Sequence, residues 1–396
     1  MLPVLFVILI LVFCLVSRSL ERTVVTAPII FTLVGMAMVP ALETVRLRVD
    51  IHLFLNVAEL GLVLLLFIDA SRTKLDVLKN IRALPARLLS VGMLLTILLG
   101  MIAARLVFPA LSIWEAGILA AILAPTDAGL GQIIVNSPLV PEKIRQALNV
   151  EAGLNDGLAV PFLLFFIAMA TGGGEADFAR FIGEQLGLGV LIGIAVGLVA
   201  GWLLDLAIRR EWMAESFEQI GVVTLPVLCL LISHKLGASM FIAAFVAGLA
   251  VQIRFKDAGR HSLEFAEGWG QLFNLSVFFL FGMLVARDLL LFGIGSILYA
   301  VLSLTVVRML PVALSLIGTR LDKATILFMG WFGPRGLASI VLGLVYIEQE
   351  KHLPGETVIR LAVMATVFLS IVAHGLSAVP CIGLYASTEQ NRPGRI

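Results

Sequence analysis

The stretch that decides the fold runs from Ala121 to Gly157 and reads AILAPTDAGLGQIIVNSPLVPEKIRQALNVEAGLNDG. It places Asp127, Glu151 and Asp156 among residues that are otherwise suited to hydrocarbon. A charged side chain at the middle of a bilayer costs at least about 2.5 kcal/mol, so such residues are rare in membrane-spanning segments. We therefore take Asp127 and Asp156 as candidate functional residues.

The composition of the whole chain indicates a membrane protein. Of the 396 residues 60% are hydrophobic and 14% charged, and the mean hydropathy is +1.05. Soluble domains carry about 25% charged residues. A net charge of +1 without a long basic block gives no basis for binding nucleic acid. The three cysteines lie in apolar runs, which favours neither a disulfide framework nor a Cys/His metal site, and we expect no resident cofactor.

Apolar runs, measured against about 20 residues per span, predict an all-α polytopic membrane protein with thirteen transmembrane helices. The expected ranges are 2–16, 24–40, 53–70, 86–108, 114–135, 147–171, 182–208, 217–234, 238–253, 269–286, 289–317, 321–347 and 357–385. The first run resembles the apolar part of a signal peptide. No basic stretch precedes it and no small-residue cleavage site follows, so we interpret it as a retained span.

The loop charges predict the orientation of the chain. Alternate loops carry eighteen lysines and arginines in one set and seven in the other. Because positive residues are retained on the cytoplasmic side, we expect the N-terminus outside and the C-terminus in the cytoplasm. The compact loops suit a prokaryotic inner membrane.

Thirteen helices allow two inverted repeats, which are common in secondary transporters. Residues 1–172 would form the first six-helix repeat, 173–210 the linking helix and 211–396 the second repeat. The fifth and twelfth helices then correspond, and each carries a break, at 124–127 (APTD) and at 333–336 (GPRG). Proline removes a backbone donor and glycine lowers the cost of unwound backbone. Two broken helices at matching positions mark the expected binding site.

The predicted seventh helix carries a stripe of small residues. Its glycines are Gly189, Gly193, Gly197 and Gly201, which share one face. Such a face lets a neighbouring helix approach closely, and we interpret it as intramolecular packing in preference to a dimer interface.

The acidic residues of the sixth helix point in different directions. Glu151 and Asn155 are four residues apart and share a face, whereas Asp156 is turned by about 100° from Asn155. We expect Asp156 to face the cavity between the broken helices. Glu151 is expected to form a buried ion pair with Arg308 or with Arg335, and the sequence does not choose between them.

Other polar residues are set aside. Glu59, Asp69, Asp205 and Arg105 lie toward span ends, where interfacial or snorkelling side chains are common. His374, within the last predicted helix, is interpreted as a structural histidine.

Three motifs carry a resemblance to a known family. APTD at 124–127, ExxxND at 151–156 and WFGPRG at 331–336 resemble the motifs of monovalent cation:proton antiporters, in the NhaP-type sodium/proton exchanger branch with an Asn-Asp pair on the sixth helix. The resemblance implies an NhaA-like antiporter fold and a homodimer. It also implies a core domain of helices 4–6 and 11–13 that slides against a scaffold of helices 1–3 and 7–10.

The resemblance also implies roles for single residues. Asp156 would be the main carrier of the ion and the proton, and Asp127 and Thr126 would help to form the sodium site. Asn155 would stand where electrogenic relatives have a second aspartate, which implies exchange of one sodium ion for one proton. Glu151 and its arginine would be structural.

Two departures from the family pattern concern this site. Ala152 stands where a serine is frequent, which leaves the ion site one oxygen poorer, and Ala128 stands where a proline is frequent.

Elementary electrostatics explains how such a site would exchange ions. Partial desolvation favours the neutral form of a carboxyl group, and either a proton or a dehydrated sodium ion can neutralise Asp156. If the core moves only when Asp156 is neutralised, the two fluxes are coupled. The expected partners are therefore monovalent cations, protons and the lipid bilayer. The alternatives are a K⁺/H⁺ antiporter, a cation channel or a sodium-coupled symporter of an organic anion. We find no pattern typical of an enzyme.

Overall fold

The computed structural model describes residues 2–20, 23–44, 51–72, 83–172, 187–253, 259–348 and 353–390. These ranges are helical, contain no strand, and follow the predicted order. The helices are α1 (Leu2–Leu20), α2 (Ala27–Thr44), α3 (Ile51–Arg72), α5 (Ala83–Arg87), α6 (Met93–Val107), α7 (Ile113–Ile122), α8 (Ala128–Val135), α9 (Glu142–Ala170), α11 (Leu188–Arg209), α12 (Glu215–Leu236), α13 (Met240–Val251), α14 (Gly259–Asp288), α15 (Ile294–Leu304), α16 (Val306–Ser315), α17 (Lys323–Trp331), α18 (Leu337–Glu348) and α19 (Glu356–Gln390).

Length and composition make these helices suited to a bilayer. Within the described ranges, eight helices are long and apolar enough to cross a membrane, and five shorter apolar helices accompany them. A π-helical turn, η1 (Leu88–Gly92), joins α5 to α6. When each interrupted helix is counted once, the described residues form thirteen helical segments, as the apolar runs predict.

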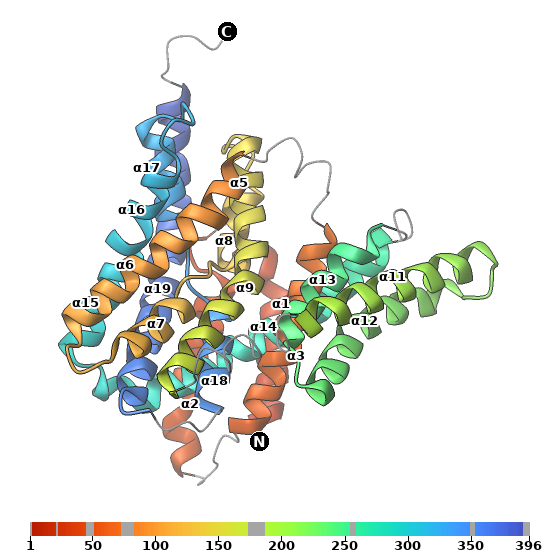
Figure 1. The fold of residues 1–396 in the computed structure, drawn as a ribbon, viewed down its shortest axis with the longest axis horizontal. Helices are drawn as coiled ribbons and strands as arrows, with labels where there is room; N and C mark the ends of the chain where they lie inside the picture. Colours follow the sequence, from red (N-terminus) through yellow and green to blue (C-terminus); the bar gives the residue numbers. More distant parts are fainter. Residues whose placement is uncertain are drawn as a thin grey trace.

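The helices pack in two groups (Figure 1). In the first group, α14 packs against α2 and α3, and α13 packs against α3, α11 and α12. In the second, α6 packs against α7, α7 against α9, α15 against α19 and α16 against α17. Figure 1 shows α11, α12 and α13 on one side of the molecule and α6, α15, α16 and α17 on the other.

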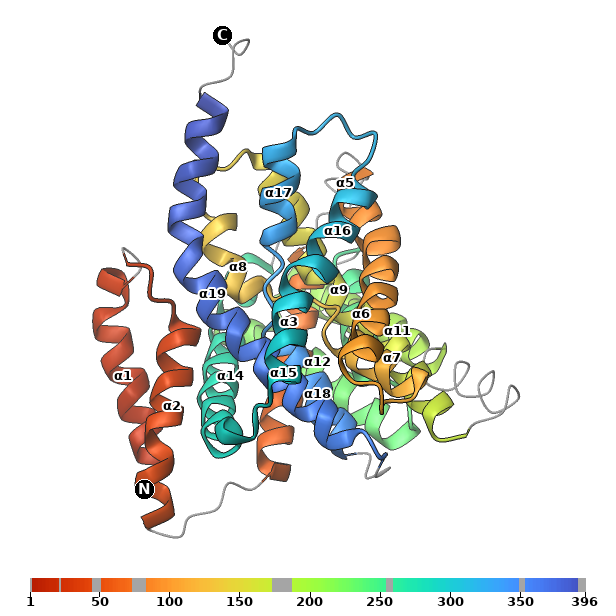
Figure 2. The ribbon, with the colours of Figure 1, turned by 90° about the vertical axis from the view of Figure 1, so that its left-hand side faces the viewer.

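Two interruptions bring four half-helices together. The fifth segment is divided into α7 and α8, and the twelfth into α17 and α18. Figure 2 shows α8 and α17 toward one end of the molecule and α7 and α18 toward the other. The two broken helices therefore run in opposite directions, which is the relation that inverted repeats require.

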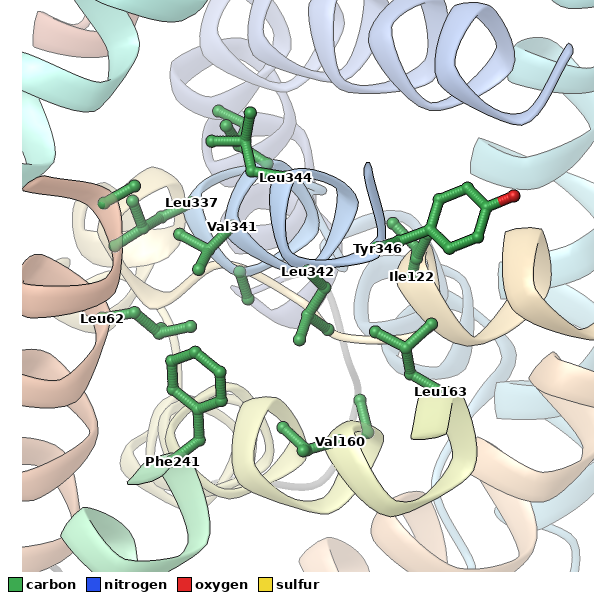
Figure 3. Close-up of a cluster of buried hydrophobic side chains, with 14 of the residues drawn as sticks. Leu62, Ile122, Val160, Leu163, Phe241, Leu337, Val341, Leu342, Leu344 and Tyr346 are labelled. Atoms are coloured by element: carbon green, nitrogen blue, oxygen red, sulfur yellow. The ribbon is translucent and has the colours of Figure 1, made fainter. Parts of the chain in front are cut away.

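Helix α18 lies at the centre of the core (Figure 3). Its apolar side chains meet side chains from α3, α7, α9 and α13. The residues involved are Leu62, Ile122, Val160, Leu163, Phe241, Leu337, Val341, Leu342, Leu344 and Tyr346. Because α18 is buried on several sides, its first residue is held firmly at the break that precedes it.

The glycine stripe of α11 packs within the molecule, as predicted. A Cβ atom added at Gly197 would lie 2.6 Å from the carbonyl oxygen of Ala247 on α13, and one added at Gly193 would lie 2.6 Å from that of Ala243. Backbone atoms cannot move away as a flexible side chain can. The glycines are therefore needed for the close approach of α11 and α13.

This contact predicts the effect of a larger residue. Gly197→Leu should destabilise the protein by about 1–3 kcal/mol, because it forces two helices apart. Thermal unfolding followed by tryptophan fluorescence measures the change. Val199→Leu on the exposed side of the same helix is the control. Equal midpoints for the two variants would show that the approach of α11 and α13 does not need glycine.

Some predicted boundaries are wrong. The sixth segment begins at Glu142 instead of 147, and the tenth at Gly259 instead of 269, because helices continue into polar sequence that the apolar runs do not include. The eleventh segment is interrupted at Thr305, which the sequence did not indicate. The start of the predicted linking helix, 173–186, and many loop residues of the charge count lie outside the described residues.

Candidate functional site

The two breaks are bonded directly to each other. The backbone nitrogen of Asp127, in the first break, donates to the carbonyl oxygen of Pro334 in the second at 2.8 Å. Nη1 of Arg335 donates to the carbonyl oxygens of Pro125, at 2.9 Å, and of Ala124. Backbone groups freed from the helical pattern in one break are thus satisfied by the other.

Asp127 accepts hydrogen bonds from the first turns of two half-helices. Its Oδ1 accepts the backbone N–H of Leu130 at 3.1 Å, and its Oδ2 accepts that of Leu337 at 2.6 Å. These N–H groups belong to the first turns of α8 and α18, where a negative charge is stabilising. Arg335, fully buried, lies at the carbonyl end of α7. The two charges therefore offset the partial charges of the half-helix ends.

Asp156 has a different environment. It is half-buried on α9, and its Oδ1 is buried without a hydrogen-bond partner among the described residues. Asp127 and Asp69 lie within electrostatic range of it. Asp127 thus accepts a backbone N–H at each of its two oxygens, whereas Oδ1 of Asp156 has no partner among the described residues.

Asn155 connects the first break to α9. Its Nδ2 donates to Oγ1 of Thr126 at 2.7 Å, and both side chains are buried. The Oδ1 of Asn155 has no partner among the described residues. The structure therefore brings Thr126 and Asn155 into direct contact, beside Asp127 and Asp156.

Glu151 pairs with Arg308. The two side chains form a bidentate ion pair, with Nη1 to Oε1 at 2.5 Å and Nη2 to Oε2 at 2.9 Å, and both are nearly inaccessible to solvent. This resolves the choice that the sequence left open. Arg335 instead donates hydrogen bonds to the first break, at the carbonyl oxygens of Ala124 and Pro125.

A small cavity lies between the breaks and α9. Its volume is about 20 Å³. One water molecule needs about 10–15 Å³. The lining residues are Thr126, Asp127, Gly131, Ile134, Val135, Leu148, Asn149, Ala152, Phe332 and Pro334. Asp156 follows Ala152 by four residues, on the same helix face and one turn beyond the lining. The cavity therefore has room for one small occupant next to the candidate acids.

Three polar residues that were not predicted to belong to this site lie near it, and one of them, Asp69, was assigned to a span end. Asn149 lines the cavity, three residues before Ala152. Asp69 faces α9, because a Cβ atom at Gly153 would lie 3.4 Å from its Cβ atom. Asn274 of α14 reaches Gly129, where an added Cβ atom would lie 3.2 Å from its Nδ2. The helical spacing of Asn149 and Ala152 was the one available signal, since the other two contacts join distant segments.

A polytopic helical protein with two interrupted helices that meet at buried charges has the architecture of secondary transporters. Residues 4–382 match the family described as "Sodium/hydrogen exchanger, transmembrane", and the chain belongs to this family.

Named relatives are similar to part of the chain. This chain is 28% identical to the K(+)/H(+) antiporter NhaP2 of Shewanella oneidensis over 276 residues, which cover 67% of this chain and 46% of that protein. It is 27% identical to the Na(+)/H(+) antiporter of Schizosaccharomyces pombe over 310 residues, 68% of this chain and 64% of that protein. The chain spans about half the length of the NhaP2 relatives that it matches.

Solved structures share the fold. The structure of the sodium proton antiporter MjNhaP1 from Methanocaldococcus jannaschii at pH 8 superposes with a TM-score of 0.79, at 20% identity, over 98% of both chains. A 3D EM map of MjNhaP1 gives a TM-score of 0.81 at 19% identity. The antiporter fold predicted from the sequence is thus confirmed.

Proposed function

We propose that this protein is a secondary active antiporter that exchanges a monovalent cation for a proton, with Asp156 as the shared carrier. The observation that carries the proposal is the contrast between the two acids: backbone N–H groups occupy both oxygens of Asp127, whereas Oδ1 of Asp156 has no partner among the described residues. The names of the relatives as cation/proton antiporters support it.

The exchange follows from competition at one carboxyl group. A charged Asp156 would face the charges of Asp127 and Asp69 with little solvent to screen them. Neutralisation by a proton or by a dehydrated cation relieves this repulsion, but both cannot occupy the same oxygen atoms. The hydroxyl group of Thr126 and carbonyl groups of the breaks would supply further ligands. Asp127 would act mainly through the charge that it holds at the half-helix ends.

Alternating access would come from the two groups of helices. The contacts of α2, α3 and α11–α14 with one another support a scaffold of α1–α3 and α11–α14, and the other helices would form the moving core. The cavity lies near the loop between α8 and α9, since Val135 and Leu148 line it. The positive-inside count puts that loop in the cytoplasm, so the cavity would lie on the cytoplasmic side of the breaks.

The finer properties are part of the same proposal. We expect sodium as the cation, with potassium as the alternative that the NhaP2 relatives favour, and electroneutral exchange of one ion for one proton because Asn155 cannot titrate. We also expect a homodimer in a prokaryotic inner membrane, with the N-terminus outside, and no enzymatic activity.

Exchange in proteoliposomes tests the function. The purified chain is reconstituted with an imposed pH gradient, and sodium, lithium and potassium are supplied in turn. An antiporter drives the cation uphill with saturation. Flux that runs only downhill and follows the voltage would indicate a channel instead, and sodium-dependent uptake of an organic anion without proton movement would indicate a symporter.

A single oxygen added to the cavity should change its affinity. Ala152 lines the cavity, so Ala152→Ser should lower the apparent KM for the preferred cation by about fivefold, the factor that one added polar contact supplies. Initial exchange rates across cation concentrations measure the KM. Ala159→Ser, on the same helix but away from the cavity, is the control. If Ala152→Ser leaves the KM unchanged, another group already supplies this oxygen.

A further inference from the structure

The second break leaves the backbone N–H of Arg335 without its helical acceptor. In an uninterrupted α-helix the N–H of Arg335 would donate to the carbonyl oxygen of Trp331, four residues earlier. Here the Arg335 N–H donates to Oγ of Ser370 at 2.6 Å, and the Trp331 carbonyl lies 2.9 Å from Nε2 of His374. Both partners belong to α19.

The two partners are also joined to each other. Oγ of Ser370 and Nδ1 of His374 lie 3.1 Å apart, one turn along α19. The path from the Arg335 N–H to the Trp331 carbonyl is therefore continuous through two side chains. Side chains of α19 thus bond the two backbone groups that would bond each other in an uninterrupted helix.

Donor and acceptor roles along this path are fixed at its ends. A backbone N–H only donates and a carbonyl oxygen only accepts. The imidazole of His374 must therefore carry a proton on Nε2 to bond the Trp331 carbonyl. In the neutral ring Nδ1 then accepts the hydroxyl proton of Ser370, while Oγ accepts the N–H of Arg335. The Ser370 carbonyl oxygen, 3.0 Å from Nδ1, is then a close neighbour without a hydrogen bond to the ring. Every group on the path is satisfied.

We propose that Ser370 and His374 are positioning residues that hold the second break in its open geometry. Both are buried, and the His374 ring stacks on that of Trp331, with centroids 4.9 Å apart. Removing the Ser370 hydroxyl group would leave the buried N–H of Arg335 without its partner, which is costly. Removing the His374 ring would leave the Trp331 carbonyl with the Gly333 N–H as its remaining donor. The segment between its ends contains Phe332 and Pro334, which line the cavity, and the Pro334 carbonyl that accepts the Asp127 N–H.

The effect of Ser370 and His374 on ion binding rests on the proposed function, whereas their effect on the geometry of the break does not. A neighbouring residue of α19 provides a matched control for both effects. Thr366 lies one turn before Ser370 on α19 and is equally buried, but its hydroxyl group donates to the Ala362 carbonyl of its own helix. Thr366→Val therefore removes a buried hydroxyl group without touching the break.

Hydrogen–deuterium exchange of the full chain in detergent tests the structural part. Ser370→Ala and His374→Leu should each speed exchange of the amides of residues 332, 333 and 335–337 by about fivefold, the factor for one lost hydrogen bond. His374→Gln keeps an N–H donor and should stay near the wild-type rate, as should Thr366→Val. Wild-type rates in Ser370→Ala, whose small change preserves folding, would overturn the proposal.

Transport tests the positioning role. In proteoliposomes Ser370→Ala should raise the apparent KM for the cation by about fivefold, with a smaller change in the maximal rate, and His374→Gln should restore most of the loss seen in His374→Leu. A KM unchanged in Ser370→Ala would overturn the positioning role. Absence of exchange in the wild-type chain would instead reject the proposed function, and the amide rates would still decide whether α19 holds the break.

Discussion

Replacing Asp156 with asparagine is expected to reduce exchange to the level of empty liposomes while the protein stays folded. Asparagine is nearly isosteric with aspartate, but it carries neither a titratable proton nor a charge that attracts a cation. Oδ1 of Asp156 has no hydrogen-bond partner among the described residues, so the change removes no hydrogen bond at that atom. It also removes a negative charge close to those of Asp127 and Asp69. We therefore expect an unfolding midpoint at or above that of the wild type.

The measurement pairs exchange with stability. Proton movement is followed with a pH-sensitive dye inside proteoliposomes, and unfolding is followed in detergent. Asp205→Asn is the matched control, because Asp205 forms a pair with Arg209 at 2.9 Å on α11, where the Arg209 side chain is largely exposed. It should exchange at the wild-type rate. Coupled exchange that survives in Asp156→Asn would reject Asp156 as the carrier, and loss of folding would reject the expectation that this site is under electrostatic strain.

The parts of the fold that could be predicted are those with a local signal. Apolar runs locate the helices because hydrocarbon excludes charged residues over the length of a span. Proline and glycine locate the breaks because their backbone effects act on neighbouring residues. The glycines of α11 indicated a close helix contact because four residues on one face need only helical geometry to be recognised.

The parts that could not be predicted depend on contacts between distant segments. Glu151 and Arg308 are 157 residues apart, and nothing in the sequence distinguishes Arg308 from Arg335 as the partner. Asp127 looked like an ion ligand, but the N–H of Leu337, 210 residues away, accounts for one of its oxygens. Asp69 was set aside because it lies near a span end, yet it faces α9.

The position of a charged residue along a span therefore indicates its role less well than the group that its side chain contacts. His374, interpreted from the sequence as a structural histidine, contacts the broken helix at the Trp331 carbonyl as well as Ser370 on its own helix. Its importance depends on the Trp331 carbonyl, which has lost its helical donor. That loss is visible only when the path of the backbone through the break is known.

The ion pair between Glu151 and Arg308 gives the second large prediction. Arg308→Met should destabilise the protein by about 3–5 kcal/mol, because it leaves the carboxylate of Glu151 buried without its counter-charge. Only 3% of that side chain is exposed. Thermal unfolding in detergent measures the loss, and Arg209→Met, which breaks an exposed pair, should cost less than about 1 kcal/mol.

The double variant separates the stranded charge from the lost contact. If the cost arises from an unpaired carboxylate, adding Glu151→Gln to Arg308→Met should recover most of the stability, since replacing both members of a buried pair is far less costly than removing one. If the cost arises from the shape of Arg308, which packs against Gly333 in the second break, the double variant should be no more stable than the single one. A single variant as stable as the wild type would mean that water reaches the carboxylate of Glu151, contrary to its burial.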